Sequence, residues 1–309
     1  MALLEPSFRA TITDLLTEEE YAKASGLVQL AGNAKYLISP ALAGILLSVS
    51  DIRLILLLDI GTFFITVAMV ALVRKTIQKP VKKEAQGFIR ELKQGFCVVT
   101  GNRGVLALVM LMASLCFFIG FVQTLMSPMI LAVSDARTLG ILESVCTIGM
   151  LVGSIWIGLI GLKKNYTGVL GTAGVFCGLF LSLSGVNRDL IFTGACIFLF
   201  FLTLPFMNTC ADVLIRGNIP NELQGRAWGI ISLLSQAGTI LAYAVSGILA
   251  DYIFEPMLSQ DGLLAGSVGK WIGTGDGRGI GCLLILAGLG MTFAAFRILR
   301  SREIRKLQE

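Results

Sequence analysis

The sequence contains no histidine, and charged residues fill only 15% of its 309 positions. The missing imidazole excludes histidine-based acid–base catalysis, histidine metal sites and serine–histidine triads. A soluble protein of this size carries about 25% charged residues, so this chain has too few charges to cover a soluble surface. Hydrophobic residues make up 55% of it instead. These proportions predict a membrane protein.

Several motif classes are also missing. The seven cysteines are scattered and form no CxxC pair, which argues against a zinc site, a redox motif or a disulfide framework. The glycine-rich string GTGDGRGIG (273–281) fits no nucleotide-binding pattern. Without paired mid-span carboxylates or a Ser/Lys dyad, the chain is not expected to be an enzyme, and neither a metal nor a cofactor is expected.

Eight stretches are apolar over the roughly 20 residues that a helix needs to cross a bilayer. No removable signal peptide is expected before them. The sequence therefore predicts an all-α, polytopic membrane protein with about eight transmembrane helices. The stretches are 26–49, 54–73, 105–125, 139–162, 168–184, 190–213, 228–249 and 279–299.

The lysines and arginines divide unequally between the loops on the two sides of these spans. If the segment before the first span lies inside, nineteen fall on that side and five on the other, with Lys35 inside a span. Basic loops remain cytoplasmic, so both termini are predicted to be cytoplasmic in a multi-pass protein of the cell membrane. This placement accounts for the net charge of +5, and no nucleic-acid partner is expected.

Two segments, 17–46 and 220–249, align without gaps at an offset of 203 residues. Glu19 matches Glu222, Lys23 matches Arg226, and Gly26 matches Gly229. The alternative is chance similarity between two apolar helices, but polar loop residues match as well. Internal repeats in polytopic proteins are typical of transporters whose site lies between the repeats. Four spans lie between the long loop 74–104 and the second copy, whereas almost nothing precedes the first copy, so three to four helices of a first half are expected to be missing.

Four segments resemble parts of one known family. Residues 6–27, 88–109 and 251–281 resemble the helix 4–5 loop, the linker into helix 7 and the helix 11–12 loop of major facilitator superfamily transporters of the drug and macrolide efflux type. The segment SPALAG (39–44) resembles the antiporter motif GPxxGG of helix 5. Ser39 and Ala43 replace two of its glycines, whereas Pro40 and Gly44 are retained.

This resemblance implies helices 5–12 of a twelve-helix major facilitator fold in three parts. Residues 1–73 would be a remnant of the N-terminal half, 74–104 a cytoplasmic linker with an amphipathic helix, and 105–309 a six-helix C-terminal half. The implied function is proton-coupled efflux of small hydrophobic or amphipathic compounds by alternating access, with a small-molecule substrate, protons and the lipid bilayer as partners. The alternative is a truncated, transport-incompetent remnant or a membrane partner of another transporter subunit. The oligomeric state is left open.

Polar side chains within the spans are the candidate pathway residues. Lys35 lies about 13 Å deep at 1.5 Å per residue, where an ammonium costs at least ~2.5 kcal/mol. It forms a pair or relay with Glu143 if helices 5 and 8 pack together as in the family; otherwise both side chains snorkel to water independently. The other candidates, which bind substrate or bridge helices, are Asn33, Tyr36, Gln123, Asn208 and Gln236.

The linker carries a separate signal. Within 84–99, Phe88, Ile89, Leu92 and Phe96 fall on one helical face, with the basic residues elsewhere. This pattern predicts an amphipathic helix that lies on the cytoplasmic membrane surface.

Overall fold

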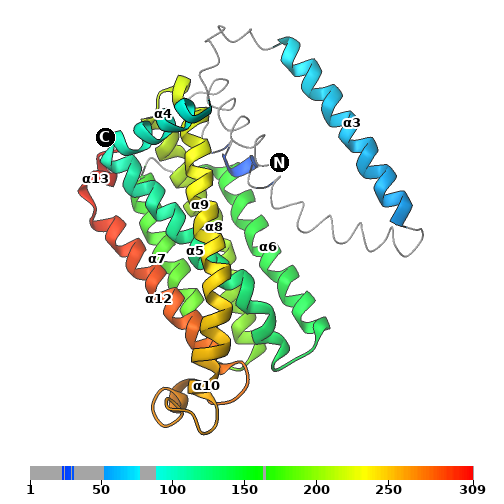
Figure 1. Cartoon of the computed structure of the whole chain (residues 1–309), viewed down its shortest axis with the longest axis vertical. Helices are drawn as coiled ribbons and strands as arrows, with labels where there is room; N and C mark the ends of the chain where they lie inside the picture. Colours follow the sequence, from blue (N-terminus) through cyan, green and yellow to red (C-terminus); the bar gives the residue numbers. More distant parts are fainter. Residues whose placement is uncertain are drawn as a thin grey trace.

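The structure is a computed structural model that describes residues 23, 25–28, 30, 52–76, 88–162 and 165–308. Its described elements are all helices joined by turns. Six of them are long and apolar enough to cross a membrane, and they stand side by side as one bundle (Figure 1). The prediction of an all-α, polytopic membrane protein is therefore confirmed.

The last six predicted spans each correspond to one of these helices. They are α5 (Arg103–Leu131), α6 (Ala136–Ile160), α7 (Tyr166–Ser184), α8 (Leu190–Asn218), α9 (Asn221–Leu249) and α12 (Arg278–Arg300). The second predicted span falls within α3 (Ile52–Thr76), whose apolar stretch is Leu56–Ala68. The first, 26–49, lies outside the described residues except at its start.

The largest difference from the predicted boundaries concerns the span expected over 228–249. The helix begins at Asn221 and continues through the π-helical turn η1 (Ala250–Phe254) into α10 (Glu255–Leu258). Hydropathy marks where the apolar residues end, but helical hydrogen bonding continues into polar flanks such as those at Glu222 and Glu255. The sequence pattern therefore underestimated the length of this helix.

Side-chain caps fix the beginnings of four bundle helices. Asn102 accepts hydrogen bonds from the Gly104 and Val105 amides, and Asp135 accepts from the Thr138 amide and hydroxyl. These caps satisfy first-turn N–H groups that have no partner within the helix. The same role falls to Asn165 for α7 and Asp189 for α8.

Small residues set the spacing of the bundle helices. A Cβ added at Gly153 of α6 would lie 2.5 Å from the Leu202 carbonyl oxygen of α8, and one at Gly120 of α5 would lie 2.6 Å from the Ala242 Cβ of α9. Membrane helices associate largely through such close backbone contact, since lipid supplies little hydrophobic driving force. Gly120 and Gly153 thus serve helix packing.

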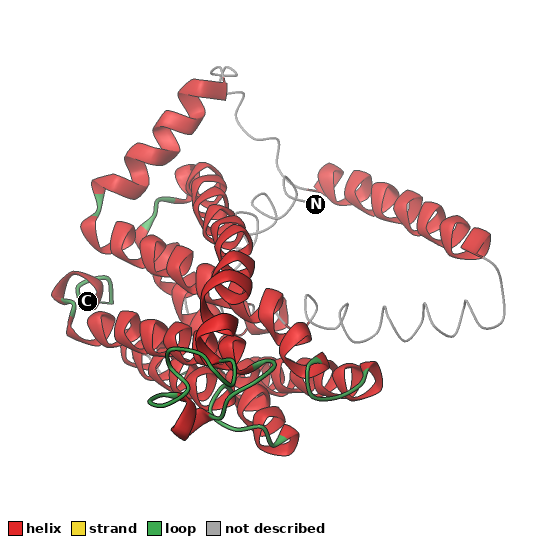
Figure 2. Ribbon diagram, turned by 60° about the horizontal axis from the view of Figure 1, so that its bottom comes forward, coloured by secondary structure: helices red, strands yellow, loops and turns green. Residues whose placement is uncertain are grey.

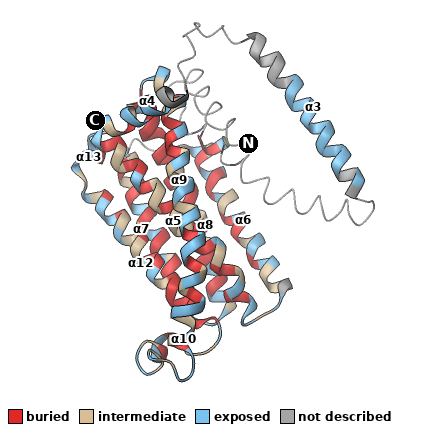
Figure 3. Ribbon diagram, viewed as in Figure 1, coloured by how far each residue is buried: buried red, intermediate tan, exposed pale blue. Residues whose placement is uncertain are grey.

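The outside of the bundle is apolar. Exposed residues lie on the outward faces of several helices (Figure 3), among them Leu159, Ile191 and Phe293, which are 78%, 83% and 65% exposed. Large contiguous apolar surfaces of this kind are rare on soluble monomers. The pattern is that of a protein whose outer faces are covered by lipid.

The helix α3 stands apart from the bundle (Figures 1 and 2). Each of its side chains that the structure describes is exposed, including Phe63 at 62% and Phe64 at 65%. Its apolar surface therefore has no cover from the described part of the chain.

The linker forms α4 (Phe88–Gly101), which confirms a helix there. Gly95 and Val99 are buried, and Arg226 of α9 donates a 2.6 Å hydrogen bond to the Gln94 side-chain oxygen. Leu92 and Phe96, on the stripe next to Gly95 and Val99, remain exposed. The helix therefore docks on the bundle and leaves two large apolar side chains uncovered beside the docked stripe.

A long loop joins α10 to α12 and contains the short α11 (Gly269–Ile272). Its glycine-rich string turns at Gly273, Gly275 and Gly277, whose φ angles are 88°, 101° and 77°. These values favour glycine because a Cβ strains the backbone there. The string is therefore a turn-forming loop. Beyond α12, the chain ends in α13 (Arg302–Arg305) at the end of the bundle that also carries α4.

Candidate transport pathway

One continuous stripe of α9 faces out of the bundle. It contains residues spaced by three or four positions, which share one side of a helix; these are Gly225, Gly229, Leu233, Gln236, Ile240 and Tyr243, all exposed. A Cβ added at Gly225 or Gly229 would meet nothing within 4 Å. We call these six residues the open stripe. Because α9 is the least buried of the six candidate spans, the stripe offers a mixed polar and apolar surface to whatever lies beside it.

The structure brings Gln123 of α5 to the open stripe. The Tyr243 hydroxyl donates a hydrogen bond to the Gln123 side-chain oxygen, and both side chains remain exposed. Gln123 was a predicted pathway residue, but Tyr243 was missed. A helical projection from Gln236 would have found it, because residue 243 lies seven positions on and returns to the same face.

The other two predicted amides occupy different environments. Gln236 is exposed near the middle of the open stripe, whereas Asn208 is half-buried in α8. The Gln236 amide is therefore uncovered by the rest of the described chain, and Asn208 sits among the packed helices.

Glu143 is exposed on α6, seven residues after the helix begins. No ion pair joins it to another described side chain. Gly161 lies eighteen residues, or five helical turns, after Glu143 and therefore on the same side of α6. Near that end a Cβ added at Gly158 would lie 3.5 Å from the Leu27 Cδ2, and one at Gly161 would lie 3.7 Å from the Lys23 Cε. The residues around Gly26 thus pack along the side of α6 that carries Glu143.

The two copies of the repeat meet different surroundings. Gly26 packs on α6, where an added Cβ would lie 3.0 Å from the Gly158 amide nitrogen, whereas its counterpart Gly229 is open. Lys23 is exposed beside α6, whereas its counterpart Arg226 binds α4. Glu222 is exposed in the first turn of α9, where a carboxylate favours the helix dipole.

Several predicted residues lie outside the described part of the chain. They are Glu19, Asn33, Lys35, Tyr36, Ser39, Pro40, Ala43 and Gly44. Their roles remain predictions.

Nothing in the described region assembles a metal centre. No group of three or more Cys, Asp or Glu side chains there is arranged to hold an ion. All seven cysteines have free thiols.

The comparison with family models decides the identity of this bundle. The model described as Major Facilitator Superfamily matches residues 1–243. The chain belongs to the Major Facilitator Superfamily. Membership in this superfamily of transporters confirms the prediction that the chain is not an enzyme, and makes the bundle part of a facilitator fold.

Curated relatives of this facilitator chain carry a common name. A protein named macrolide efflux protein A from Streptococcus pyogenes is 29% identical over 256 residues, which cover 80% of this chain and 62% of the relative. A protein of the same name from Enterococcus faecalis is 30% identical over 241 residues, which cover 75% and 74%. The chain thus spans less than two thirds of the streptococcal relative's length.

Proposed function

We propose that this facilitator chain takes part in proton-coupled efflux of small hydrophobic or amphipathic compounds of the macrolide type, by alternating access. The open stripe carries the proposal. It presents Gln236 and the Tyr243–Gln123 pair among exposed apolar and glycine residues. Binding sites for such compounds are largely apolar, with a few well-placed hydrogen-bonding groups. The names of the two relatives support the export direction and the class of compound.

Glu143 supports the coupling part of the proposal. A carboxylate on the exposed face of a membrane-spanning helix is costly in lipid, and such groups generally face a cavity, water or a partner. We therefore assign Glu143 to the pathway as the proton-carrying group of the proposal.

Lys35 enters the proposal from the sequence alone, as a basic residue within an apolar stretch, where charged side chains generally face a cavity or a partner. We propose that Lys35 and Glu143 border one seam and exchange protons through water, with Asn33 and Tyr36 beside them.

The remaining parts of the proposal follow the charge distribution. We place α4, α13 and both chain termini on the cytoplasmic side, because this assignment puts the basic loops inside. The division into 1–73, 74–104 and 105–309 belongs to the same proposal, with the SPALAG segment (39–44) as the gating element of the first part.

An accumulation assay in living cells tests the function. Bacteria that express the chain should retain less labelled macrolide than cells with an empty vector, and a protonophore should remove the difference. Glu143→Gln should abolish proton-driven export at equal membrane abundance, whereas Glu303→Gln on α13 should leave it within twofold. Equal accumulation with and without the chain, across a panel of hydrophobic and amphipathic compounds, would contradict the proposal.

A further inference from the structure

The loop that joins α10 to α12, residues 259–277, lies at the end of the bundle opposite α4 and α13 (Figure 1). Hydrogen bonds hold it against the helix ends. The Gly275 amide donates to the Leu258 carbonyl of α10 at 2.9 Å, and the Arg188 guanidinium, between α7 and α8, donates to the Thr274 carbonyl. Loop 259–277 is therefore fixed on the bundle.

This loop closes over a small apolar core of its own. Leu258 of α10, Ile272 of α11 and Cys282 of α12 are buried there, and Leu264 packs against them. Because these residues come from the loop and from both flanking helices, the core decides which side chains of the loop turn inward.

Two large apolar side chains turn away from this core. Leu263 directly precedes Leu264 and is 89% exposed. Trp271 directly precedes the buried Ile272 and is 88% exposed. They are the two most exposed large apolar side chains in the part of the chain that the structure describes. Lys270, next to Trp271, is exposed as well. The loop thus presents an indole ring, an aliphatic side chain and a cation to its surroundings.

The neighbouring helix ends set the height of the loop relative to the bilayer. With 23 residues, α12 is about 34 Å long at 1.5 Å per residue, close to the roughly 30 Å thickness of the hydrocarbon core. Its first residue, Arg278, donates to the Gly185 carbonyl at the end of α7 at 2.8 Å. A Cβ added at Gly279 would collide with the Phe254–Glu255 peptide. These segments therefore share one level at the boundary of the hydrocarbon core, and the loop lies just beyond it.

The chemistry of the exposed side chains matches that level. The apolar outer surface of the bundle continues up to it, since Ile253 of η1 is 42% exposed and Leu286 of α12 is 49% exposed. Tryptophan is enriched at membrane–water interfaces because its ring is apolar while its N–H remains a donor. A lysine there can extend its charged end to the polar side. Trp271 and Lys270 together therefore suit a layer of lipid headgroups.

We propose that loop 259–277 lies in the lipid headgroup layer. The Trp271 ring and the Leu263 side chain insert toward the acyl chains, and the Lys270 ammonium meets the lipid phosphates. The partner of this surface is the bilayer, not a second protein chain. The loop thereby anchors the ends of α9 and α12, and this role depends neither on transport nor on which side of the membrane the loop occupies.

Fluorescence of the full chain in phosphatidylcholine nanodiscs tests where Trp271 lies. The emission lost in Trp271→Phe is the contribution of Trp271. Lipid brominated near the headgroup should quench this contribution at least twofold more than lipid brominated near the chain end, and aqueous iodide should quench it less than half as strongly as free tryptophan. Quenching by iodide as strong as for free tryptophan would place the loop in water and overturn the proposal. Protection from iodide and from both brominated lipids, as under a second protein chain, would also overturn it.

Matched variants test the anchoring by amide hydrogen exchange in the same nanodiscs. Trp271→Glu should raise exchange across 259–277 several-fold, because a carboxylate does not remain at the acyl chains. Gln260→Glu adds the same charge at an exposed position of the same loop and should stay within twofold. Since Trp271 is 88% exposed, its replacement removes little packing within the chain. Equal exchange in Trp271→Glu and the parent chain would contradict the anchor.

Discussion

The Tyr243 hydroxyl of α9 donates a hydrogen bond to the Gln123 side-chain oxygen of α5, although the two residues are 120 positions apart. The glycine contacts between α5 and α9 allow this reach, because Gly120 packs on Ala242 and Gly238 packs on Ala113. A polar pair is thereby fixed on an exposed surface of two membrane-spanning helices. Because the pair lies beside the open stripe, we propose it as a recognition element for the compound that the proposed function would export.

Tyr243→Phe should therefore reduce export or change the compounds exported. The substitution keeps the ring but removes one hydrogen bond, which is worth about 1 kcal/mol, or roughly fivefold in an affinity. Competition between labelled and unlabelled compounds in cells measures the change. Tyr252→Phe, on the exposed turn η1, is the matched control and should have no effect. If Tyr243→Phe exports the same compounds to the same extent as the parent chain at equal abundance, the Tyr243–Gln123 pair has no role in recognition.

The close contact between α6 and α8 predicts opposite effects of one substitution at two sites of α6. Gly153→Ala places a methyl 2.5 Å from the Leu202 carbonyl oxygen, whereas Gly140→Ala meets nothing within 4 Å. Overpacking costs about 1–3 kcal/mol, while Ala in an open helix gains up to about 1 kcal/mol over Gly.

Thermal unfolding of the two purified variants checks this prediction. Gly153→Ala should melt several degrees below the parent chain, and Gly140→Ala at or above it. Equal melting temperatures for both variants would mean that α6 and α8 are not packed as closely as described.

The docking of α4 should depend on Gly95. A Cβ there would lie 2.7 Å from the Arg226 carbonyl oxygen, but one at Gly101 of the same helix would meet nothing within 4 Å. Gly95→Val should release α4 from α9 and raise amide hydrogen exchange throughout α4. Gly101→Val should leave exchange in the centre of the helix unchanged. Protection that survives Gly95→Val would show that α4 is held by other contacts.

The cap of α6 predicts a pH dependence. The Thr138 amide and hydroxyl donate to Asp135 and hold the pKa of its carboxyl below the ordinary value of 3.8. A lowered pKa in the folded state means that the cap contributes fully above that value and is lost as the pH falls through the folded-state pKa.

Hydrogen exchange at the first turn of α6 measures this cap. Asp135→Ala should speed exchange near Thr138 at neutral pH, whereas Asp135→Asn should retain an acceptor and most of the protection. The acid-dependent loss should be absent from Asp135→Asn. If the parent and Asp135→Ala exchange at the same rate, the cap has no role.

The contact of residues 25–28 with α6 can be tested by cross-linking. In Leu27→Cys with Gly158→Cys, the two thiols should join under mild oxidation, because the Leu27 side chain lies against Gly158. Leu27→Cys with Gly140→Cys should not join, since position 140 is eighteen residues, or about 27 Å, further along α6. With a protease site inserted within 77–87, cleavage separates the two segments unless a disulfide joins them. The size of the product therefore shows which cysteine pairs have joined. Joining of the second pair and not the first would contradict the contact between Leu27 and Gly158.

The sequence predicted the long apolar helices well because membrane spans are set by local hydropathy. Their boundaries were less accurate where a helix leaves the membrane, as at Glu222 and Glu255 of the helix that begins at Asn221. The site was predictable only in part. Gln123, Gln236 and Glu143 stand out as polar residues in apolar helices, but nothing local to Gln123 indicates that Tyr243 is its partner.

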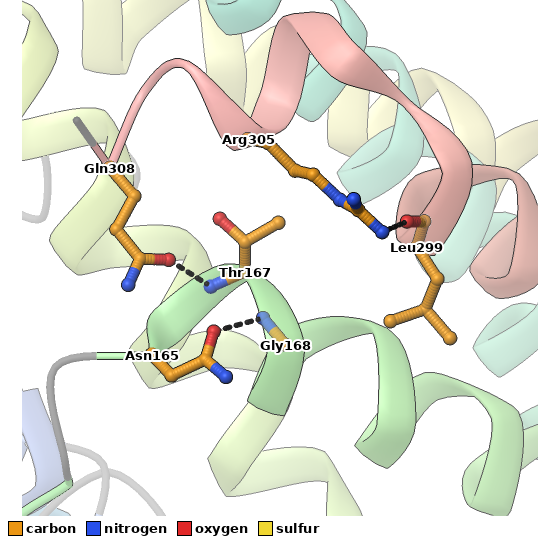
Figure 4. A pocket seen from close by; sticks show the side chains of 6 residues that line it. All are labelled: Asn165, Thr167, Gly168, Leu299, Arg305 and Gln308. Atoms are coloured by element: carbon orange, nitrogen blue, oxygen red, sulfur yellow. Dashed lines mark hydrogen bonds between the residues drawn. The ribbon is translucent and has the colours of Figure 1, made fainter.

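The cavity between α7 and the C-terminal segment was harder still to foresee (Figure 4). Thr167 and Arg305 are unremarkable at their own positions, and only the packing of the C-terminal segment on α7 brings them to one cavity. In the same way, Leu92 and Phe96 stand out in the sequence as apolar residues of α4, whereas the docking of this helix through Gly95 depends on α9. Contacts between residues that are far apart in the sequence are therefore the features of the structure that the sequence pattern did not predict.

Uptake into everted membrane vesicles from cells that express the chain is the decisive measurement of proton-coupled export. An imposed proton gradient, acidic inside, should drive labelled macrolide into vesicles that contain the chain. A protonophore should stop the uptake, and vesicles with Glu143→Gln should lack it. Uptake no greater than in vesicles without the chain, for a folded protein and a panel of hydrophobic and amphipathic compounds, would contradict proton-coupled export.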